Sequence, residues 1–336
     1  MAIDFTCRGL LGRGRGTATG NSCVTGTAPA LLGTTCDPAF EWKVYGFSSL
    51  LQRGATPANS APFHCCGYKW FLRVTPMHKK SGDGIVHLAL DLAISRIGLE
   101  QGLVMNAVFE LSMYNHSSGT YYGGKASYSF NVKKTHSKKM CLIRLGKLLK
   151  SSDYLVDGSC VFGVRILKAD VSSPKKMAVV ISEKPVTVQN LFLQKKDLVK
   201  GTYTWTMNNY LDLKLPVNSP AFEVGGHKWH IRMHPLGDQY STNSLSLYLH
   251  LHDPKELPDP EPGMMIELAL CILDQKYGKH FTVKGRFVFR IGSKAGWGWS
   301  NFIALNIFKD QSRGYLVGSN CFLKADITVI GSSNDN

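Results

Sequence analysis

Three histidines in the segment FEVGGHKWHIRMHP (222–235) have the spacing of candidate metal ligands: His227, His230 and His234. Imidazole nitrogens are common zinc ligands, and a structural zinc site takes four protein ligands. The segment alternates apolar and polar residues, which is typical of a β-strand. Side chains three positions apart on a strand point to opposite faces, so only His230 and His234 can face the same way. We therefore predict solvent-facing histidines, and neither a metal site nor a metal cofactor.

The residues His64, Cys65 and Cys66 could supply a thiolate nucleophile and its base. Neighbours in sequence diverge on a strand, however, and no Asn or Asp context completes the arrangement of a cysteine protease. The glycine-rich run GRGRGTATG (12–20) could cradle a phosphate, but it lacks the Gly-Lys-Ser/Thr ending and no strand precedes it. We predict no catalytic residues, no cofactor and no enzymatic activity.

The histidine segment has a counterpart earlier in the chain. FHCCGYKWFLRVTP (63–76) precedes it by 159 positions with the same Phe, Gly, Lys-Trp and Pro. LALDL (88–92) matches LSLYL (245–249), and YLVDGSC (154–160) matches YLVGSNC (315–321), at similar offsets. A repeat this long indicates a duplicated domain rather than a solenoid. A chain of 336 residues also exceeds what one hydrophobic core usually supports.

Nearly every strong apolar segment alternates with a period of two. In 245–252 the leucines take one face, while Ser246, Tyr248 and two histidines take the other. Alternation of this kind predicts half-buried antiparallel strands. The predicted fold class is all-β, with two tandem antiparallel β-sandwiches of seven to eight strands each and short helical elements in 141–155 and 300–316.

The repeat divides the chain into two domains with segments around them. We expect the apolar runs at 177–181 and 186–193, between the domains, to pair with a sandwich or pack on it, because they are too apolar to stay in solvent. The predicted parts are a disordered Gly/Ser/Thr/Arg tail (1–36), the first copy (37–171), a linker (172–201), the second copy (202–331) and a short tail (332–336).

The net charge of +15 is concentrated in the first half of the chain. Residues 37–201 hold 23 Lys and Arg against 11 Asp and Glu, whereas the second copy is nearly neutral. This basic region leaves open an alternative function, a nucleic-acid or anionic-surface binder acting through residues 37–201. Basic surface more often only solvates a face, so nucleic acid is the less favoured partner.

The nine cysteines are an odd number without framework spacing, which favours reduced thiols in the cytoplasm, with the nucleus as the alternative. Cys160 and Cys321 follow the two Tyr-Leu-Val tripeptides and are expected as paired core positions. The N-terminus lacks the apolar run of a secretory signal, and import into an organelle is less favoured. No apolar run reaches the roughly 18 residues of a membrane span, so we expect no membrane insertion.

The order of motifs in the second copy resembles the meprin and TRAF homology (MATH) domain. The motifs are aromatic-x-Trp (203–205), Ser-x-x-Phe (219–222), Gly-x-x-Trp-x-Ile-Arg-x-x-Pro (226–235), Leu-Ser-Leu-Tyr-Leu (245–249) and Trp-Gly-Trp-x-x-Phe-Ile (297–303). The first copy matches at its start, middle and end, so the chain looks like a plant-type tandem MATH protein. The resemblance implies TRAF-like sandwiches in an adaptor that binds short extended peptides of partner proteins. Association with itself or with other MATH proteins is a further class of partner.

The resemblance also implies a peptide-binding groove in the second copy. Carried over by motif, its residues are Tyr248, Leu268, Phe289, Trp297, Gly298 and Trp299. Alternation places Tyr248 opposite the inward leucines, and Gly298 between two large aromatics would let a peptide backbone approach closely. The alternative is that Trp297 and Trp299 belong to the core.

The first copy lacks this aromatic set. Asp91 is aligned with Tyr248, and Ser137-Lys138-Lys139 is aligned with the Trp-Gly-Trp segment. We predict that the first copy does not bind the same type of peptide. It either serves as a scaffold or binds an acidic partner through four lysines: Lys133, Lys134, Lys138 and Lys139. The alternative is that this lysine run is a solvated turn.

Overall fold

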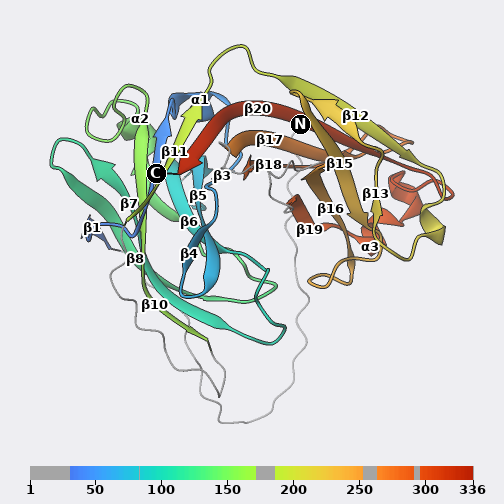
Figure 1. Cartoon of the computed structure of the whole chain (residues 1–336), viewed down its shortest axis with the longest axis horizontal. Coiled ribbons are helices and arrows are strands. Elements are labelled where there is room, and N and C mark those ends of the chain that lie inside the picture. The colour runs from blue at the N-terminus through green and yellow to red at the C-terminus, as the bar shows by residue number, and fades with distance from the viewer. Residues whose placement is uncertain (1–30, 83, 172–185, 253–262, 291–295, 336) are drawn as a thin grey trace, which may run out of the picture.

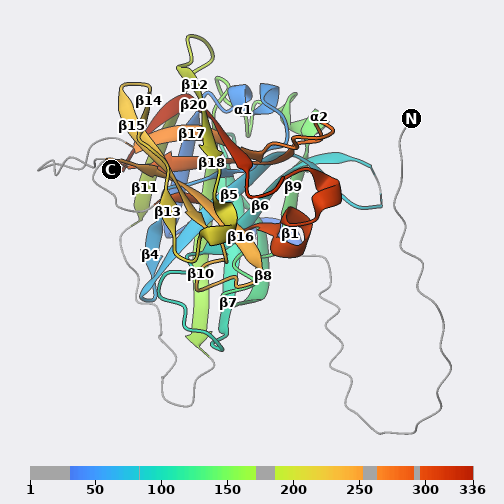
Figure 2. The same cartoon turned by 90° about the vertical axis from the view of Figure 1, so that its right-hand side faces the viewer.

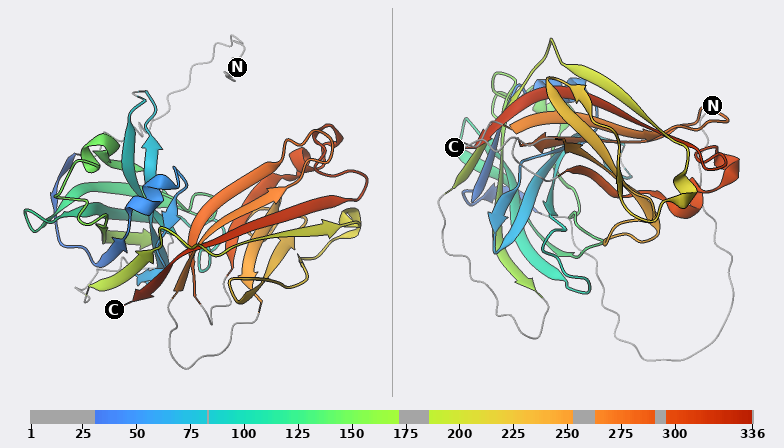
Figure 3. Two further views of the ribbon diagram at one scale, coloured as in Figure 1. Left: turned by 90° about the horizontal axis from the view of Figure 1, so that it is seen from above. Right: turned by 45° about the vertical axis from the view of Figure 1, so that its right-hand side comes forward.

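The computed structural model of the chain describes residues 31–82, 84–171, 186–252, 263–290 and 296–335. Strands and short helices occur twice in the same order, and the two copies lie side by side (Figure 1; Figure 3, left). The first copy contains β2 (Phe40–Tyr45), α1 (Ser48–Gln52), β3 (Ala58–Asn59), β4 (Phe63–Cys65), β5 (Tyr68–Lys79), β6 (Val86–Ile94), β7 (Met105–Asn115), β8 (Thr120–Phe130), β9 (Met140–Arg144), α2 (Leu145–Leu148) and β10 (Cys160–Val171).

The second copy repeats this order. It contains β12 (Lys200–Met207), η1 (Tyr210–Asp212), β13 (Val217–Asn218), β14 (Phe222–Val224), β15 (His227–His234), β16 (Ser244–Leu251), β17 (Gly263–Ile272), β18 (Phe281–Phe289), β19 (Trp297–Ala304), α3 (Leu305–Phe308), η2 (Gln311–Arg313) and β20 (Cys321–Asp335). Two strands lie outside the repeat, β1 (Leu32–Thr35) before the first copy and β11 (Thr187–Leu193) between the copies. The predicted all-β class with two tandem sandwiches is confirmed.

Equivalent side chains make the same contacts in both copies. The indole nitrogen of Trp70 donates to the carbonyl oxygen of Cys65 at 3.0 Å, and that of Trp229 donates to Val224 at the same distance. Both tryptophans are fully buried and anchor their cores. Cys160 and Cys321 are also fully buried, as the matching tripeptides predicted.

Each copy packs a small sheet against a larger one. In the second copy the small sheet has the order β13-β15-β16-β19, with β14 on β15, and it faces a layer made of β12, β20, β17 and β18. In the first copy the sheet that contains β5, β6 and β9 faces the layer β1-β8-β7-β10-β2. Apolar side chains fill the space between the layers of each copy because alternate residues point inward.

The two copies are continuous through their sheets. Strand β11 pairs in parallel with β2 of the first copy and antiparallel with the end of β20 of the second. Strand β3 of the first copy also forms a bridge with β18, so the strands join into one fifteen-stranded sheet. Figure 1 shows β20 running from the second copy to its end beside the first, and Figures 1 and 2 both place β18 beside strands of the first copy.

Two predicted segments differ in the structure. Part of the predicted N-terminal tail, Leu32–Thr35, forms β1 and pairs with β8, while residues 1–30 lie outside the described part of the chain. Residues 332–335 of the predicted C-terminal tail extend β20 and pair with β11. Both segments are ordered by long-range backbone pairing, which local composition does not report. The apolar run at 186–193 pairs with both copies through β11, as expected for part of the linker, while the run at 177–181 lies outside the described residues.

Candidate functional site

The register of β16 and β19 determines which faces the candidate residues occupy. Leu247 lies opposite Trp299 and Leu249 opposite Trp297, so the two tryptophans share the inner face with the leucines. Tyr248 lies opposite Gly298 on the outer face. The sequence correctly placed the tryptophans on one face and Tyr248 away from the leucines. It did not show that the tyrosine and the tryptophans flank β19 from opposite sides.

Tyr248 is half-buried because neighbouring side chains pack around its ring. Its hydroxyl donates to the carboxylate of Asp238 at 2.5 Å, and its ring contacts His234 and His250 edge to face. Burial, followed by the hydrogen bond to Asp238, raises the pKa of the phenol well above its usual range. The hydroxyl therefore remains protonated at neutral pH and keeps its hydrogen bond to Asp238.

Trp297 is held by aromatic side chains from both copies. Phe287 of β18 stacks on it at 4.9 Å, and Phe71 of the first copy meets it edge to face at 5.1 Å. Its indole nitrogen donates to the carbonyl oxygen of Val288 at 2.8 Å. Trp299 contacts Phe287 edge to face at 5.7 Å. Both tryptophans are half-buried, so each belongs partly to the core and partly to the surface.

A glycine is required at position 298 for a different reason than the sequence suggested. A Cβ atom at this position would overlap the carbonyl oxygen of Leu247 and the Cα atom of Tyr248 on β16. The glycine therefore permits the close approach of the neighbouring strand within the sheet. An approaching peptide backbone is not needed to explain it.

Two of the predicted groove residues belong to the core. Leu268 is fully buried on β17, and Phe289 on β18 packs edge to face against Trp229 at 5.1 Å. Neither side chain can touch a peptide on the surface, so their assignment to the groove is wrong. The alternation in 266–272, where Leu268 shares a face with Ile266 and Leu270, was the signal for its burial.

In the first copy the position of Tyr248 is occupied by a buried ion pair. Arg73 lies opposite Asp91, as Arg232 lies opposite Tyr248, which confirms the alignment of these two positions. The Nε atom of Arg73 lies 3.1 Å from Oδ2 of Asp91, whose side chain is almost fully buried. Burial raises the pKa of Asp91, and the Arg73 guanidinium opposes that shift.

The lysine run lies one residue out of the predicted register. Leu90 pairs with Met140 where Leu247 pairs with Trp299, so the counterpart of Trp-Gly-Trp is 138–140 rather than 137–139. Lys133 and Lys134 lie in a turn where both backbone N–H groups donate to the side chain of Asn131 at 2.9 Å. Both are exposed, as is Lys138, whereas Lys139 is half-buried and burial lowers its pKa.

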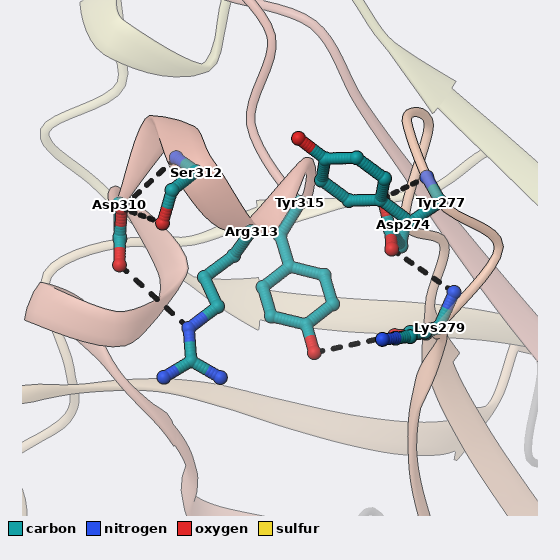
Figure 4. Close-up of a pocket in the computed structure, with 7 residues that line it drawn as sticks. All are labelled: Asp274, Tyr277, Lys279, Asp310, Ser312, Arg313 and Tyr315. Atoms are coloured by element: carbon teal, nitrogen blue, oxygen red, sulfur yellow. Dashed lines mark hydrogen bonds and ion pairs between the residues drawn. The ribbon is translucent and has the colours of Figure 1, made fainter.

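Asp274 and Asp310 of the second copy line a pocket, and both carboxylates accept hydrogen bonds from nearby backbone N–H groups (Figure 4). The carboxylate of Asp274 accepts hydrogen bonds from the backbone N–H groups of Lys276, Tyr277 and Lys279, and that of Asp310 accepts one from Ser312. These bonds to backbone N–H groups lower the pKa of Asp274, whose side chain therefore stays ionised. Both carboxylates stabilise turns, and their ionised state does not suit them to act as a general acid.

The histidines of β15 and β16 form a cluster on the outer face of the small sheet. His230 stacks on His250 at 5.2 Å and meets His252 edge to face at 5.5 Å. His230 is half-buried, unlike the solvent-facing histidine that was predicted. Among the described residues, no group of three or more His, Cys, Asp or Glu side chains is placed to hold a metal ion. No helix in the same part of the chain has the length and apolar character to cross a membrane.

Comparison with known proteins identifies the domain. The family profile of the MATH domain matches residues 39–166 and 202–327. TNF receptor-associated factor homolog 1a of Arabidopsis thaliana is 34% identical over 142 residues, which are 41% of this chain and 13% of that protein. A MATH domain and coiled-coil domain-containing protein of the same plant is 30% identical over 138 residues, which are 40% of this chain and 41% of the relative.

Two further similarities each cover less than half of this chain. Ubiquitin C-terminal hydrolase 12 of Arabidopsis thaliana is 29% identical over 145 residues, which are 43% of this chain and 12% of the hydrolase. Among solved structures, TRAF5 of Notothenia coriiceps matches 39% of this chain and 74% of its own with a TM-score of 0.31 and 22% identity. The matched segments thus span less than half of each of the three curated relatives. With both copies matched by the family profile, the chain belongs to the MATH domain family.

Proposed function

We propose that this chain is a non-catalytic adaptor that binds an extended peptide of a partner protein along the outer edge of β19. The MATH domain is a protein-interaction domain. The observation that carries the proposal is that β19 ends the small sheet of the second copy, and no described strand pairs with its other edge. An unpaired edge offers backbone N–H and C=O groups to an added strand.

The side chains around β19 would supply selectivity. A peptide on this edge would have Trp297 and Trp299 on one face of the sheet and Tyr248, which lies opposite Gly298, on the other. The Tyr248 hydroxyl is held by Asp238, so its ring is already ordered before a ligand arrives. The chain thus offers main-chain pairing with an aromatic clamp, which suits a short extended segment with an apolar side chain.

Peptide selection on the intact chain tests this proposal. A phage library of random 12-residue peptides would be selected on the full chain, and the best peptide labelled for fluorescence polarisation. Trp299→Ala should weaken its binding by about 1–3 kcal/mol, the usual range for an interface aromatic. Tyr277→Ala is the matched control, because this exposed aromatic lines the pocket of Figure 4 and is not part of β19. Failure to select any peptide, or equal binding by the Trp299 variant, would contradict the proposal.

A further inference from the structure

The outer edge of β18 is occupied by the first copy. In a separate second copy, β18 would end the layer of β12, β20, β17 and β18 and expose its backbone groups. We infer that residues 53–59, called here the latch segment, are a built-in ligand of the second copy. They fill in cis a strand-accepting edge that another chain could otherwise pair with. This edge is distinct from the edge of β19.

Backbone contacts place the latch segment as an added strand would be placed. Ala58 and Arg286 are partners in a parallel bridge. The N–H of Arg286 donates to the carbonyl oxygen of Pro57 at 3.2 Å, and the side-chain amide of Asn59 donates to the carbonyl oxygen of Arg286 at 3.0 Å. Both backbone groups of Arg286 on this edge are therefore satisfied by the first copy.

The guanidinium of Arg286 anchors the same segment. It donates to the carbonyl oxygens of Thr56 at 2.5 Å and Arg53 at 2.8 Å, and to the carboxylate of Glu267 at 2.7 Å. The Arg286 side chain is fully buried, and a buried charge is tolerated only where such partners satisfy it. Because it contacts two main-chain carbonyls, Arg286 recognises the backbone of the turn that precedes β3 rather than particular side chains.

Apolar side chains of the second copy pack against the first copy near Arg286. Met265 and Val288 of the second copy are buried, and they belong to the hydrophobic cluster of the first copy rather than to that of their own. Phe71 of the first copy contacts Trp297 a little further along. Separation of the copies would therefore expose apolar side chains as well as an open strand edge.

The corresponding edge of the first copy is also covered, by an antiparallel strand rather than a parallel bridge. Strand β8 is the counterpart of β18, and β1 pairs with it at four positions, from Leu32 with Gly124 to Thr35 with Tyr121. Both copies thus have this edge filled by a segment of the same chain that lies outside their own sandwich. The recurrence indicates that this edge is prone to strand addition and that the chain itself supplies the strand.

Hydrogen exchange on the full chain tests the latch. Arg286→Met keeps an unbranched apolar stem and removes the guanidinium. It should raise amide exchange about tenfold in both the latch segment and β18, while β7 stays protected. Arg290→Ala is the matched control, since this partly exposed arginine pairs with Asp335 outside the latch. Asn59→Ala removes the hydrogen bond that the first copy donates to the carbonyl oxygen of Arg286. This variant replaces Arg286→Met in the experiment if Arg286→Met does not fold. Unchanged exchange, or a rise confined to the substituted segment, would overturn the inference.

A peptide in trans shows whether the edge accepts a strand. A labelled peptide of residues 52–60, QRGATPANS, should bind the Asn59→Ala chain at least about tenfold more tightly than the unaltered chain. It should not bind the Arg286→Met chain, which lacks the anchor. Equal binding by all three chains would overturn the inference, whatever peptide is selected on β19.

Discussion

At the scale of single residues, the structure separates the two tryptophans that the sequence treated as a pair. Trp297 is enclosed by Phe287 of its own copy and Phe71 of the other, and its indole nitrogen is bonded to Val288. Trp299 has no ring contact with the first copy among the contacts of the described residues. The first is therefore chiefly structural, and the second is better placed to meet a ligand.

Substitution of Trp297 should cost stability as well as binding. Trp297→Ala removes the stacked ring and the edge contact with Phe71, so we expect a loss of about 2–4 kcal/mol in the free energy of unfolding. Trp299→Ala should cost clearly less. Urea denaturation of both variants measures the difference, and equal losses would place both residues in the core.

The histidine cluster should make the second copy sensitive to mild acid. Burial lowers the pKa of His230, and the nearby His252 and Arg232 act in the same direction. Because the unfolded chain takes up this proton near the ordinary pKa of 6.5, stability should be intact above that pH and fall as the pH drops below it. His230→Gln should reduce the loss of unfolding free energy between about pH 7 and pH 5. His116→Gln, at an exposed histidine of the first copy outside the cluster, is the control.

At the scale of elements, the strands added to the edges of the sandwiches matter most. Strands β1, β3 and β11 each pair with a strand far from them in sequence, namely β8, β18 and both β2 and β20. Strand β19, at one end of the small sheet of the second copy, pairs with β16 alone among the described strands. The strand edges that join the copies and the outer edge of β19 are therefore different parts of the second copy.

Removal of β1 should loosen β8. A chain that begins at residue 36 lacks the Leu32–Thr35 pairing, and we expect faster amide exchange in 120–130 and a melting temperature lower by a few degrees. A chain that begins at residue 31 keeps the strand and is the matched control. If both truncated chains behave alike, β1 contributes nothing measurable to the edge of β8.

At the scale of the whole molecule, the two copies form one body with an uneven charge. Their shared sheet and the shared apolar contacts around Met265 and Val288 favour unfolding as a single unit. The basic residues gather in the first copy and the linker, whereas the β19 edge belongs to the nearly neutral second copy. Binding at β19 should therefore depend little on the charge of the first copy.

A salt series separates the adaptor from the alternative anion binder. Between 50 and 200 mM salt, the affinity for the selected peptide should change little, whereas binding to single-stranded DNA should be weak and fall steeply. Substitution of the exposed Lys133, Lys134 and Lys138 by Gln should weaken only the DNA binding. Tight DNA binding that persists at physiological salt would favour the alternative function.

The sequence by itself determined the repeat, the all-β class and the inward face of most strands. These properties are local or periodic, since alternation reports which side chains share a face. Trp70 and Trp229, or Cys160 and Cys321, could be matched across the copies and placed in the cores from the sequence alone. The family resemblance added the region around β19 as the place to look for a ligand.

Only the tertiary structure decided which faces and edges remain accessible. The family resemblance does not tell whether a motif residue is covered by another strand, so Leu268 and Phe289 were wrongly assigned to the groove. Nor does it show that Arg286 is buried against the first copy, because that contact joins residues more than 225 positions apart. Long-range strand pairing depends on how complete sandwiches meet, and no local pattern in the sequence encodes that meeting.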